Sequence, residues 1–238
     1  CYGGGSIKSN GVWAQVRKAL GPRIALEWGG IPANPEYAVL MDCLKEVKKL
    51  ERPFLLSVGG GSVLDGVKFM AVAAFAAGDP WDILAKGTIP GKALPLGSVL
   101  TLPATGSEAN GNSVISRRET GEKLAFGSPL VFPRFSILDP TTTYTLDSRQ
   151  TANGVVDTFV HVCEQYLTTD QNTWIQDRQA EGILQTLIAL GPEVLRQPRN
   201  YDLRANLMWA STMALNELIG CGVDQDWSTH SIGHELTA

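Results

Sequence analysis

The chain has 238 residues, 44% of them hydrophobic and 18% charged, and a formal net charge of −4 at pH 7. This length and apolar content allow a well-buried core in one or two domains. Lysine and arginine form no long runs and the apolar stretches are short and interrupted, so the sequence indicates neither nucleic-acid binding nor a membrane span.

The ends of the sequence resemble cut points. Cys1-Tyr2-Gly3 resembles the end of a strand whose start is missing, and the residues from His234 onward stop within an expected helix. We therefore expect an internal fragment of a longer protein, truncated at both ends. Scattered cysteines without a CxxC pair favour a reduced, cytoplasmic protein: they are Cys1, Cys43, Cys163 and Cys221.

Short apolar runs alternate with helical patterns over the first 147 residues. This alternation predicts an α/β domain with a mainly parallel sheet and helices on both of its faces. The expected strands are at 24–27, 54–58, 98–102 and 135–138, and the expected helices are at 34–50 and 63–77.

The pattern changes after Asp147, and strand signals disappear. Asp147 or Ser148 is a suitable N-cap for a helix that runs to about residue 168. Further helices are expected at 174–190, 192–196 and 201–218. The sequence therefore predicts an α/β domain over residues 1–147 and an all-helical domain over residues 148–238.

Residues 2–6 and 58–62 share one form, an apolar or aromatic residue followed by three glycines and a serine. Glycines let backbone N–H groups approach a ligand closely, and the start of a following helix adds the positive end of its dipole. Leu64 stands where GxGxxG would need its third glycine, so the standard dinucleotide fingerprint is absent. Each segment is either a phosphate-binding turn or a tight turn without a ligand, and the pair favours a phosphate-bearing cofactor.

Two polar features accompany these turns. Asp65 falls in the first turn of the helix after residue 62, where it either stabilises the helix N-terminus or contacts a cofactor. Residues 101–108 place hydroxyl groups and a glycine after a strand, where open α/β sheets bind ligands. The alternative for this loop is an ordinary turn capped by hydroxyl groups.

Two pairs of residues, each four positions apart, suggest a metal site. Asp157 and His161 share the face of one expected helix, and its other residues there are apolar. His230 and His234 form a second pair. An aspartate and two histidines on two helices suit Zn²⁺ or Fe²⁺, although a hydrogen-bonded Asp157–His161 pair and packed histidines explain the same spacing.

The last residues of the chain can also be compared with the HExxH helix of metalloproteases. His234 and Glu235 match its first two positions, but Ala238 stands where the second histidine is required. The match therefore fails.

Taken together and in order, the motifs resemble the iron-containing (group III) alcohol dehydrogenases, and most closely the NADPH-dependent butanol dehydrogenase and aldehyde reductase branch. The resemblance runs over essentially the whole chain and implies a Rossmann-like N-terminal domain and a helical domain of dehydroquinate synthase-like architecture. The motifs are Tyr2-Gly3-Gly4-Gly5-Ser6, Gly59-Gly60-Gly61-Ser62-Val63-Leu64-Asp65, Leu102-Pro103-Ala104-Thr105-Gly106-Ser107-Glu108, Asn153-Gly154-Val155-Val156-Asp157 with His161, and Gln225-Asp226-Trp227 with His230 and Gly233-His234-Glu235-Leu236.

The resemblance also implies roles for residues. Asp157, His161 and His230 match three of four metal ligands, and the fourth is a histidine beyond the end of the chain. His234 matches a residue that lines the site and passes the proton to solvent. The implied cofactor contacts are Gly4, Gly5, Ser6, Gly59, Gly60, Ser62, Asp65, Thr101, Thr105, Ser107 and Lys123.

The resemblance favours NADP(H) over NAD(H). Family members that use NAD(H) tend to have an acidic residue beside the adenine ribose, where it repels a 2′-phosphate. This sequence has Gly5 and Ser6 in that neighbourhood, with Lys8 close by.

The expected function is hydride transfer between NADP(H) and a primary alcohol or aldehyde, assisted by Fe²⁺ or Zn²⁺, in a homodimer. The fragment itself is expected to bind metal weakly, because only three of the four ligands are present. The alternatives are a glycerol dehydrogenase-like or other metal-dependent polyol dehydrogenase, a dehydroquinate synthase relative, and a non-catalytic nucleotide-binding protein.

Overall fold

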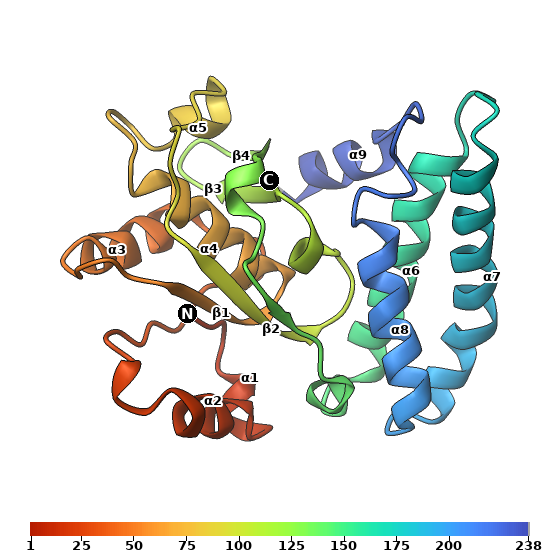
Figure 1. Ribbon diagram of the computed structural model, residues 1–238, viewed down its shortest axis with the longest axis horizontal. Helices are drawn as coiled ribbons and strands as arrows, with labels where there is room; N and C mark the ends of the chain where they lie inside the picture. The colour runs from red at the N-terminus through yellow and green to blue at the C-terminus, as the bar shows by residue number, and fades with distance from the viewer. Residues whose placement is uncertain (238) are drawn as a thin grey trace.

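The computed structural model describes residues 1–237 and has an α/β part followed by a helical part (Figure 1). A parallel three-stranded sheet has the order β1-β2-β5, with β1 at Leu55–Gly60, β2 at Leu96–Leu102 and β5 at Ser136–Ile137. Tyr2 forms a parallel bridge with Val58, so the N-terminal segment continues the sheet beside β1. The predicted parallel sheet is confirmed.

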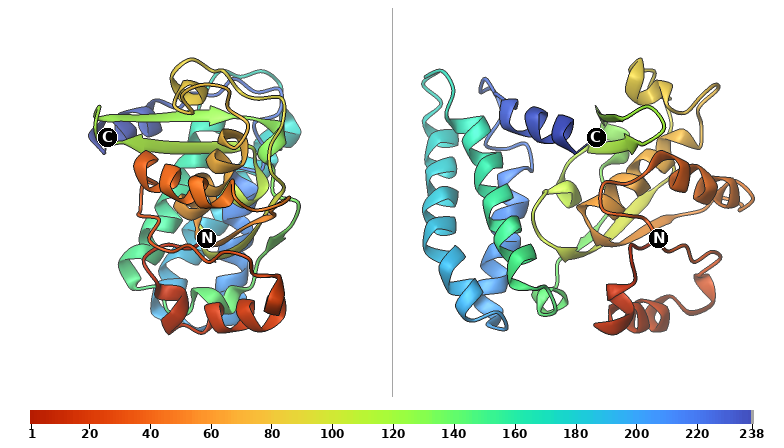
Figure 2. Two further views of the ribbon diagram at one scale, coloured as in Figure 1. Left: turned by 90° about the vertical axis from the view of Figure 1, so that its left-hand side faces the viewer. Right: turned by 180° about the vertical axis from the view of Figure 1, so that it is seen from behind.

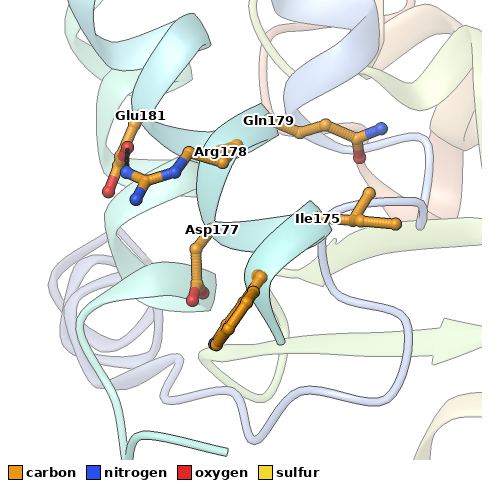
Figure 3. Close-up of a pocket in the computed structure, with 6 residues that line it drawn as sticks. Ile175, Asp177, Arg178, Gln179 and Glu181 are labelled. Carbon is orange, nitrogen blue, oxygen red and sulfur yellow. Dashed lines mark hydrogen bonds and ion pairs between the residues drawn. The ribbon is translucent and has the colours of Figure 1, made fainter. Parts of the chain in front are cut away.

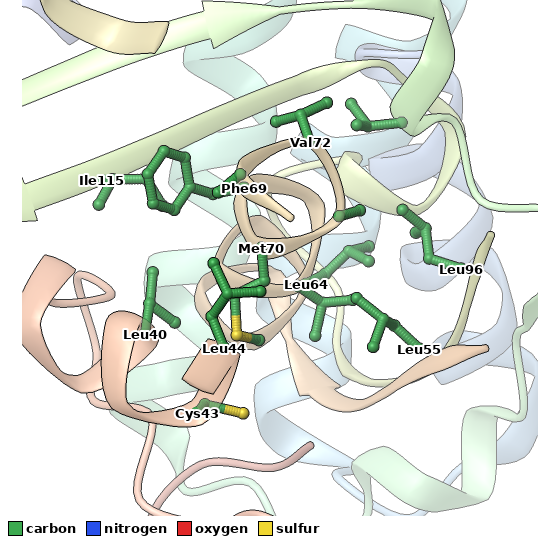
Figure 4. Packing of buried hydrophobic residues seen from close by; sticks show 14 of the residues in the cluster. Leu40, Cys43, Leu44, Leu55, Leu64, Phe69, Met70, Val72, Leu96 and Ile115 are labelled. Atoms are coloured by element: carbon green, nitrogen blue, oxygen red, sulfur yellow. The ribbon is translucent and has the colours of Figure 1, made fainter. Parts of the chain in front are cut away.

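Helix α4 (Gly61–Ala73) is the centre of the α/β part. Most of its residues are apolar and almost all are buried, as expected for a helix with neighbours on every side. It packs against the sheet, against α3 (Tyr37–Val47) and against an antiparallel hairpin formed by β3 (Asn112–Arg117) and β4 (Glu122–Gly127). Phe69 of α4 lies beside Ile115 of β3 in this core, and Leu64 of the same helix belongs to the same buried cluster (Figure 4).

The opposite face of the sheet is covered by the N-terminal helices α1 (Ser6–Ser9) and α2 (Val12–Leu20) (Figure 1). Val58 of β1 and Val99 of β2 pack there against Ile7 and Val12. Helices therefore lie on both faces of the sheet, as predicted. The short elements are α5 (Asp82–Ala85) and 3₁₀ turns at Gly21–Arg23, Ser107–Ala109, Pro129–Val131 and Pro140–Thr143.

The helical part begins at α6 (Ser148–Tyr166), and the Asp147 carboxylate caps it by accepting a hydrogen bond from the Gln150 N–H. Helices α6, α7 (Trp174–Arg196) and α8 (Tyr201–Ala214) pack side by side, as the right-hand view of Figure 2 shows. Helix α9 (Ser228–Leu236) follows a long loop and approaches β4. None of the helices described is long and apolar enough to cross a membrane.

Two sequence-based expectations differ from the structure, and one element of the structure was not expected. Residues 24–27 form no strand: the extended chain exchanges backbone hydrogen bonds with Tyr2 only from Trp28 to Ile31. The segments 174–190 and 192–196 are one helix, because α7 continues through Pro192. The β3–β4 hairpin was not predicted. Ala238, at which the HExxH comparison fails, lies outside the described residues.

Candidate active site

Asp157, His161 and His230 meet where α6 and α9 come together. Ligand atoms of the three side chains all lie within 4.8 Å of one another. Nε2 of His230 is 3.5 Å from Oδ1 of Asp157, and Nδ1 of His161 is 4.0 Å from Oδ2 of the same carboxylate. The two imidazole rings stack with centroids 4.4 Å apart. The fold therefore brings Asp157 and His161, the first predicted pair, together with His230 from the second.

This cluster fits a divalent cation. Nδ1 of His161 is buried and has no hydrogen-bond partner within the part of the chain that the structure describes. An unpartnered buried nitrogen costs free energy unless a ligand satisfies it. Two imidazoles and one carboxylate are a donor set that Zn²⁺ and Fe²⁺ both accept. The residues present therefore suit a metal and leave its identity open.

The charge states of Asp157 and His161 are compatible with metal binding. Burial lowers the pKa of His161 to about 4, so its imidazole is neutral at neutral pH. Burial alone would raise the pKa of Asp157, but the His230 and His161 imidazoles beside it hold that pKa below its usual value. A neutral imidazole and an ionised carboxylate are the forms that donate electron pairs to a cation. Burial lowers the pKa of His230, but its contacts with Asp157 and Glu164 outweigh burial and raise that pKa, so metal binding at His230 competes with a proton.

The sequence assigned no role at this cluster to two further residues, although Trp227 belongs to one of the motifs named above. Glu164 is buried and forms a hydrogen bond with Nδ1 of His230. The Trp227 ring packs against both histidines, with centroids 6.1 Å from His161 and 5.4 Å from His230. Glu164 lies seven residues after Asp157 on the same helix, so continuing the Asp157–His161 spacing by one turn would have identified it.

His234 lies beside the cluster but outside it. Its ring centroid is 6.5 Å from that of His230, with the two rings nearly perpendicular. Burial, followed by the positive charge of Lys123, lowers the pKa of His234. A neutral imidazole at the edge of the cluster has the chemistry needed to accept and release a proton.

The second of the two glycine turns, residues 58–62, has the features of a phosphate site. Helix α4 begins at Gly61 without a side-chain cap, so the N–H groups of its first turn have no side-chain acceptor among residues 1–237. A Cβ on Gly61 would approach Oγ1 of Thr105 to 2.3 Å, so only glycine fits beside this loop. Gly59, Gly60 and Ser62 belong to the same turn, and Oγ of Ser62 accepts a hydrogen bond from the Asn34 N–H.

The loop after β2 lies between this turn and α6, the helix that carries Asp157 and His161. Thr101 is buried at the end of the strand, and Oγ1 of Thr105 accepts a hydrogen bond from the Ser107 N–H. On the other side, a Cβ on Gly154 of α6 would approach the Pro103 carbonyl oxygen to 2.6 Å. One loop thus contacts both the glycine turn and the helix that carries Asp157 and His161.

Asp65 is fully hydrogen-bonded within the protein. Its Oδ1 accepts a hydrogen bond from the Ser107 hydroxyl at 2.7 Å, and its Oδ2 accepts one from the Val114 N–H at 3.0 Å. The Ser113 hydroxyl donates to its backbone carbonyl. The structure therefore joins the predicted residues Asp65 and Ser107 directly, and it ties α4 to the hairpin through them.

Lys123 bridges the two halves of the site. Its Nζ on β4 donates hydrogen bonds to Oδ1 of Asn34 at 2.9 Å and to Oγ1 of Thr237 at 2.8 Å. Asn34 also contacts Ser62, and Thr237 follows α9. A continuous polar path therefore runs from the second glycine turn to the helix that carries His230.

The first glycine turn, residues 2–6, is the more open of the two. Gly5 has a φ of +102°, which favours glycine, and a Cβ at Gly4 or Gly5 would meet no atom within 4 Å. Exposed Ser6 begins the short α1. Because Tyr2 pairs in parallel with Val58, the two glycine turns leave neighbouring strands at the same edge of the sheet.

A separate surface cavity of about 630 Å³ lies at the start of α7. Ile175, Asp177 and Arg178 are among the residues that line it (Figure 3). It contains none of the residues that the sequence predicts for the site.

The chain matches two family models. Residues 1–140 match "iron-containing alcohol dehydrogenase", and residues 151–238 match "Fe-containing alcohol dehydrogenase family, C-terminal". The predicted domain boundary at residue 147 falls between these ranges and stays a prediction.

Similar proteins agree with this match. The NADPH-dependent aldehyde reductase YqhD of Escherichia coli (strain K12) is 59% identical over all of this chain, which spans 62% of that protein. The crystal structure of E. coli YqhD superposes with a TM-score of 0.97 at 58% identity, over 99% of this chain and 61% of that one. A structure of NADH-dependent butanol dehydrogenase A from Thermotoga maritima has a TM-score of 0.92 at 38% identity, over 99% and 60% of the two chains. The chain belongs to the iron-containing alcohol dehydrogenase family.

Proposed function

We propose that the whole protein is a metal-dependent oxidoreductase that transfers a hydride between NADP(H) and a primary alcohol or aldehyde. One observation supports this proposal above the others. A three-residue metal cluster and a glycine turn suited to phosphate are connected by a loop that contacts both, through Gly154 on one side and Gly61 on the other.

Asp157, His161 and His230 would hold the cation. A bound divalent cation supplies a Lewis acid that polarises a carbonyl oxygen and lowers the pKa of an alcohol. The chain contributes the fixed donors: α6 places Asp157 and His161 one turn apart, and α9 brings His230 against them. Donors fixed in this way need little rearrangement on binding, which favours a defined position for the substrate oxygen.

The two glycine turns would hold the cofactor, whose nicotinamide carries the hydride. The uncapped start of α4 at Gly61 supports pyrophosphate binding there. Thr105 and Ser107 lie in the adjoining loop, and Lys123 lies across from it. These contacts support the cofactor roles that the sequence predicts for this part of the chain.

The preference for NADP(H) rests on the first glycine turn. No acidic side chain stands at Gly5 or Ser6, and the Lys8 ammonium lies 5.0 Å from the centroid of the Tyr2 ring beside this turn. Positive charge in this position favours a 2′-phosphate. Among the relatives, E. coli YqhD is named NADPH-dependent. A relative from Bacillus subtilis (strain 168) is named "Probable NADH-dependent butanol dehydrogenase 1" and so has NADH in its name. It is 45% identical over 100% of this chain and 62% of its own length.

His234 would pass the substrate proton to solvent. Its ring lies at the edge of the cluster, and its lowered pKa keeps it neutral and able to accept a proton at neutral pH. This role is separate from holding the metal, because the three-residue cluster does not include His234.

The test is a turnover assay on the whole protein loaded with Fe²⁺ or Zn²⁺. NADPH absorbance should fall on addition of butyraldehyde, and NADH should be the poorer donor. Absence of turnover with either metal across several straight-chain aldehydes would contradict the proposal. Oxidation of glycerol in preference to butanol would instead favour a polyol dehydrogenase.

A non-catalytic nucleotide-binding protein is tested by metal analysis of the same sample. Such a protein would bind NADPH without containing a stoichiometric metal. A homodimer also remains a proposal, which sedimentation of the whole protein would check.

A further inference from the structure

Glu164 is a buried carboxylate whose two oxygens have different partners. It lies on α6 three residues beyond His161 and is only 7% exposed. Its Oε1 accepts hydrogen bonds from the backbone N–H groups of Thr229 at 2.6 Å and His230 at 3.2 Å. Its Oε2 is bonded to Nδ1 of the His230 ring. One oxygen therefore satisfies the start of α9, and the other contacts the imidazole of a proposed metal ligand.

The two nitrogens of His230 face different groups. Nδ1 faces Oε2 of Glu164, and Nε2 faces Oδ1 of Asp157 at 3.5 Å. A neutral imidazole carries one N–H, and the nitrogen that lacks the proton is the one that binds a metal. An ionised carboxylate only accepts hydrogen bonds, so its contact with Nδ1 requires the proton to be on Nδ1. The lone pair of Nε2 is then directed toward the cluster.

We infer that Glu164 is a positioning residue that holds His230 in the Nδ1–H tautomer and anchors the start of α9 to α6, so that Nε2 is available to the metal. The inference rests on the proposed role of His230 as a ligand. Carboxylates that accept the second N–H of a ligating histidine orient its ring and raise its basicity, and their loss typically weakens metal affinity about 10–100-fold.

The substitution Glu164→Gln separates the two contacts. The amide oxygen can replace Oε1 and accept the backbone N–H groups of Thr229 and His230. The amide NH₂ then faces Nδ1 in place of Oε2. A donor at that position requires an acceptor, so His230 should shift to the Nε2–H tautomer, whose metal-facing nitrogen has no free lone pair. The reversed amide orientation would set its NH₂ against two backbone donors.

Asp226→Asn is the matched control. Oδ1 of Asp226 accepts a hydrogen bond from the Ser228 N–H at 2.9 Å, beside the start of α9. This variant also removes one negative charge near α9 and also keeps an oxygen for the backbone. It does not change the group that faces His230, so tautomer and metal affinity should equal those of the wild type.

Two measurements on the whole protein test the inference. In metal-free protein with ¹⁵N-labelled histidine, at a pH where the His230 ring is neutral, the His230 resonances should report protonated Nδ1 in the wild type and in Asp226→Asn, and protonated Nε2 in Glu164→Gln. In competition with a chromophoric chelator, the Zn²⁺ affinity of Glu164→Gln should be about 10–100-fold lower than that of the control.

The inference is wrong if the wild type carries its proton on Nε2, a result that needs no variant to fold. It is also wrong if Glu164→Gln binds Zn²⁺ as tightly as Asp226→Asn. Both readouts are independent of turnover, so absence of aldehyde reduction would contradict the proposed function without affecting this result. Loss of Zn²⁺ binding in the wild type itself would contradict the metal site and the inference with it.

Discussion

Gly154 of α6 lies directly against the carbonyl oxygen of Pro103, which a Cβ on the glycine would approach to 2.6 Å. The Thr158 hydroxyl, one turn later, also faces this loop and is 3.4 Å from the Ala104 carbonyl oxygen. This close approach is where the helical part joins the α/β part. It fixes the distance between the metal cluster and the loop beside the second glycine turn.

Gly154→Ala should separate these two parts. The added methyl group must displace α6 or the Pro103 loop, and overpacking of this kind typically costs about 1–3 kcal/mol. Thermal and urea unfolding should show this loss, together with weaker NADPH binding. The control is Gly182→Ala on α7, where a Cβ meets no atom and alanine should stabilise the helix by about 0.5–1 kcal/mol. Equal effects of the two changes would contradict the prediction.

His230→Gln and His234→Gln should have different effects although they are one helical turn apart. His230→Gln removes a cluster ligand, and the purified whole protein should lose most of its metal on dialysis against a chelator. His234→Gln should retain its metal and lower kcat by about 100-fold or more, since a positioned proton acceptor contributes roughly 100- to 10,000-fold. Elemental analysis and steady-state kinetics on the same samples check both outcomes. Metal loss in His234→Gln would assign it to the cluster instead.

Because of the buried Lys68, the free energy of unfolding should increase as the pH rises. Burial lowers its pKa to about 8, against the opposing charges of Asp65 and Glu108. An unfolded chain keeps this proton up to about pH 10.4, so between the two values the unfolded state binds more protons and folding gains up to about 3 kcal/mol.

The measurement is the free energy of unfolding at several pH values from 7 to about 10. The difference between the wild type and Lys68→Met should grow in favour of the wild type over this window. Lys45→Met, an exposed lysine on α3, is the control. A pH dependence that is the same in Lys68→Met as in the wild type would show that Lys68 keeps its proton.

Ser6→Asp should weaken NADPH binding more than NADH binding. The new carboxylate would stand at the start of α1 beside the first glycine turn, where the 2′-phosphate is expected. Repulsion between charges near a protein surface is on the order of 1–4 kcal/mol at 4 Å, so a roughly tenfold rise in the Kd for NADPH is expected. Ser9→Asp, at the other end of α1, adds the same charge farther away. Fluorescence titration with both cofactors gives the comparison.

The parts of the fold that follow from local patterns were predictable. The apolar runs at 54–58 and 98–102 became β1 and β2, and Asp147 caps α6 as its side chain and position require. The run at 24–27 failed because apolar composition alone does not supply a hydrogen-bonding partner. The β3–β4 hairpin was missed because Asn112–Arg117 is largely polar, and its pairing with Glu122–Gly127 depends on packing against α4.

The site was predictable to a similar degree. The spacing of Asp157 and His161 placed them on one face, but only the tertiary fold could bring His230 from α9 to them. For Asp65, the sequence predicted a position near the cofactor but could not identify its hydrogen-bond partners. Only the structure shows that Ser107 and Val114 donate hydrogen bonds to its two oxygens. Glu164 followed the same helical spacing and went unnoticed, because a carboxylate that acts through a histidine has no motif of its own.

The position of Lys123 has a thermodynamic consequence. Its ammonium group joins Asn34, beside the second glycine turn, to Thr237, at the end of the helix that carries His230. The ammonium has three N–H donors, so a nucleotide that accepts the third one would share this lysine with both partners, and a cation that orders α9 would act on the same ammonium from the other end. Any change that occupancy of one site makes in the affinity of the other must, by linkage, be equal in both directions.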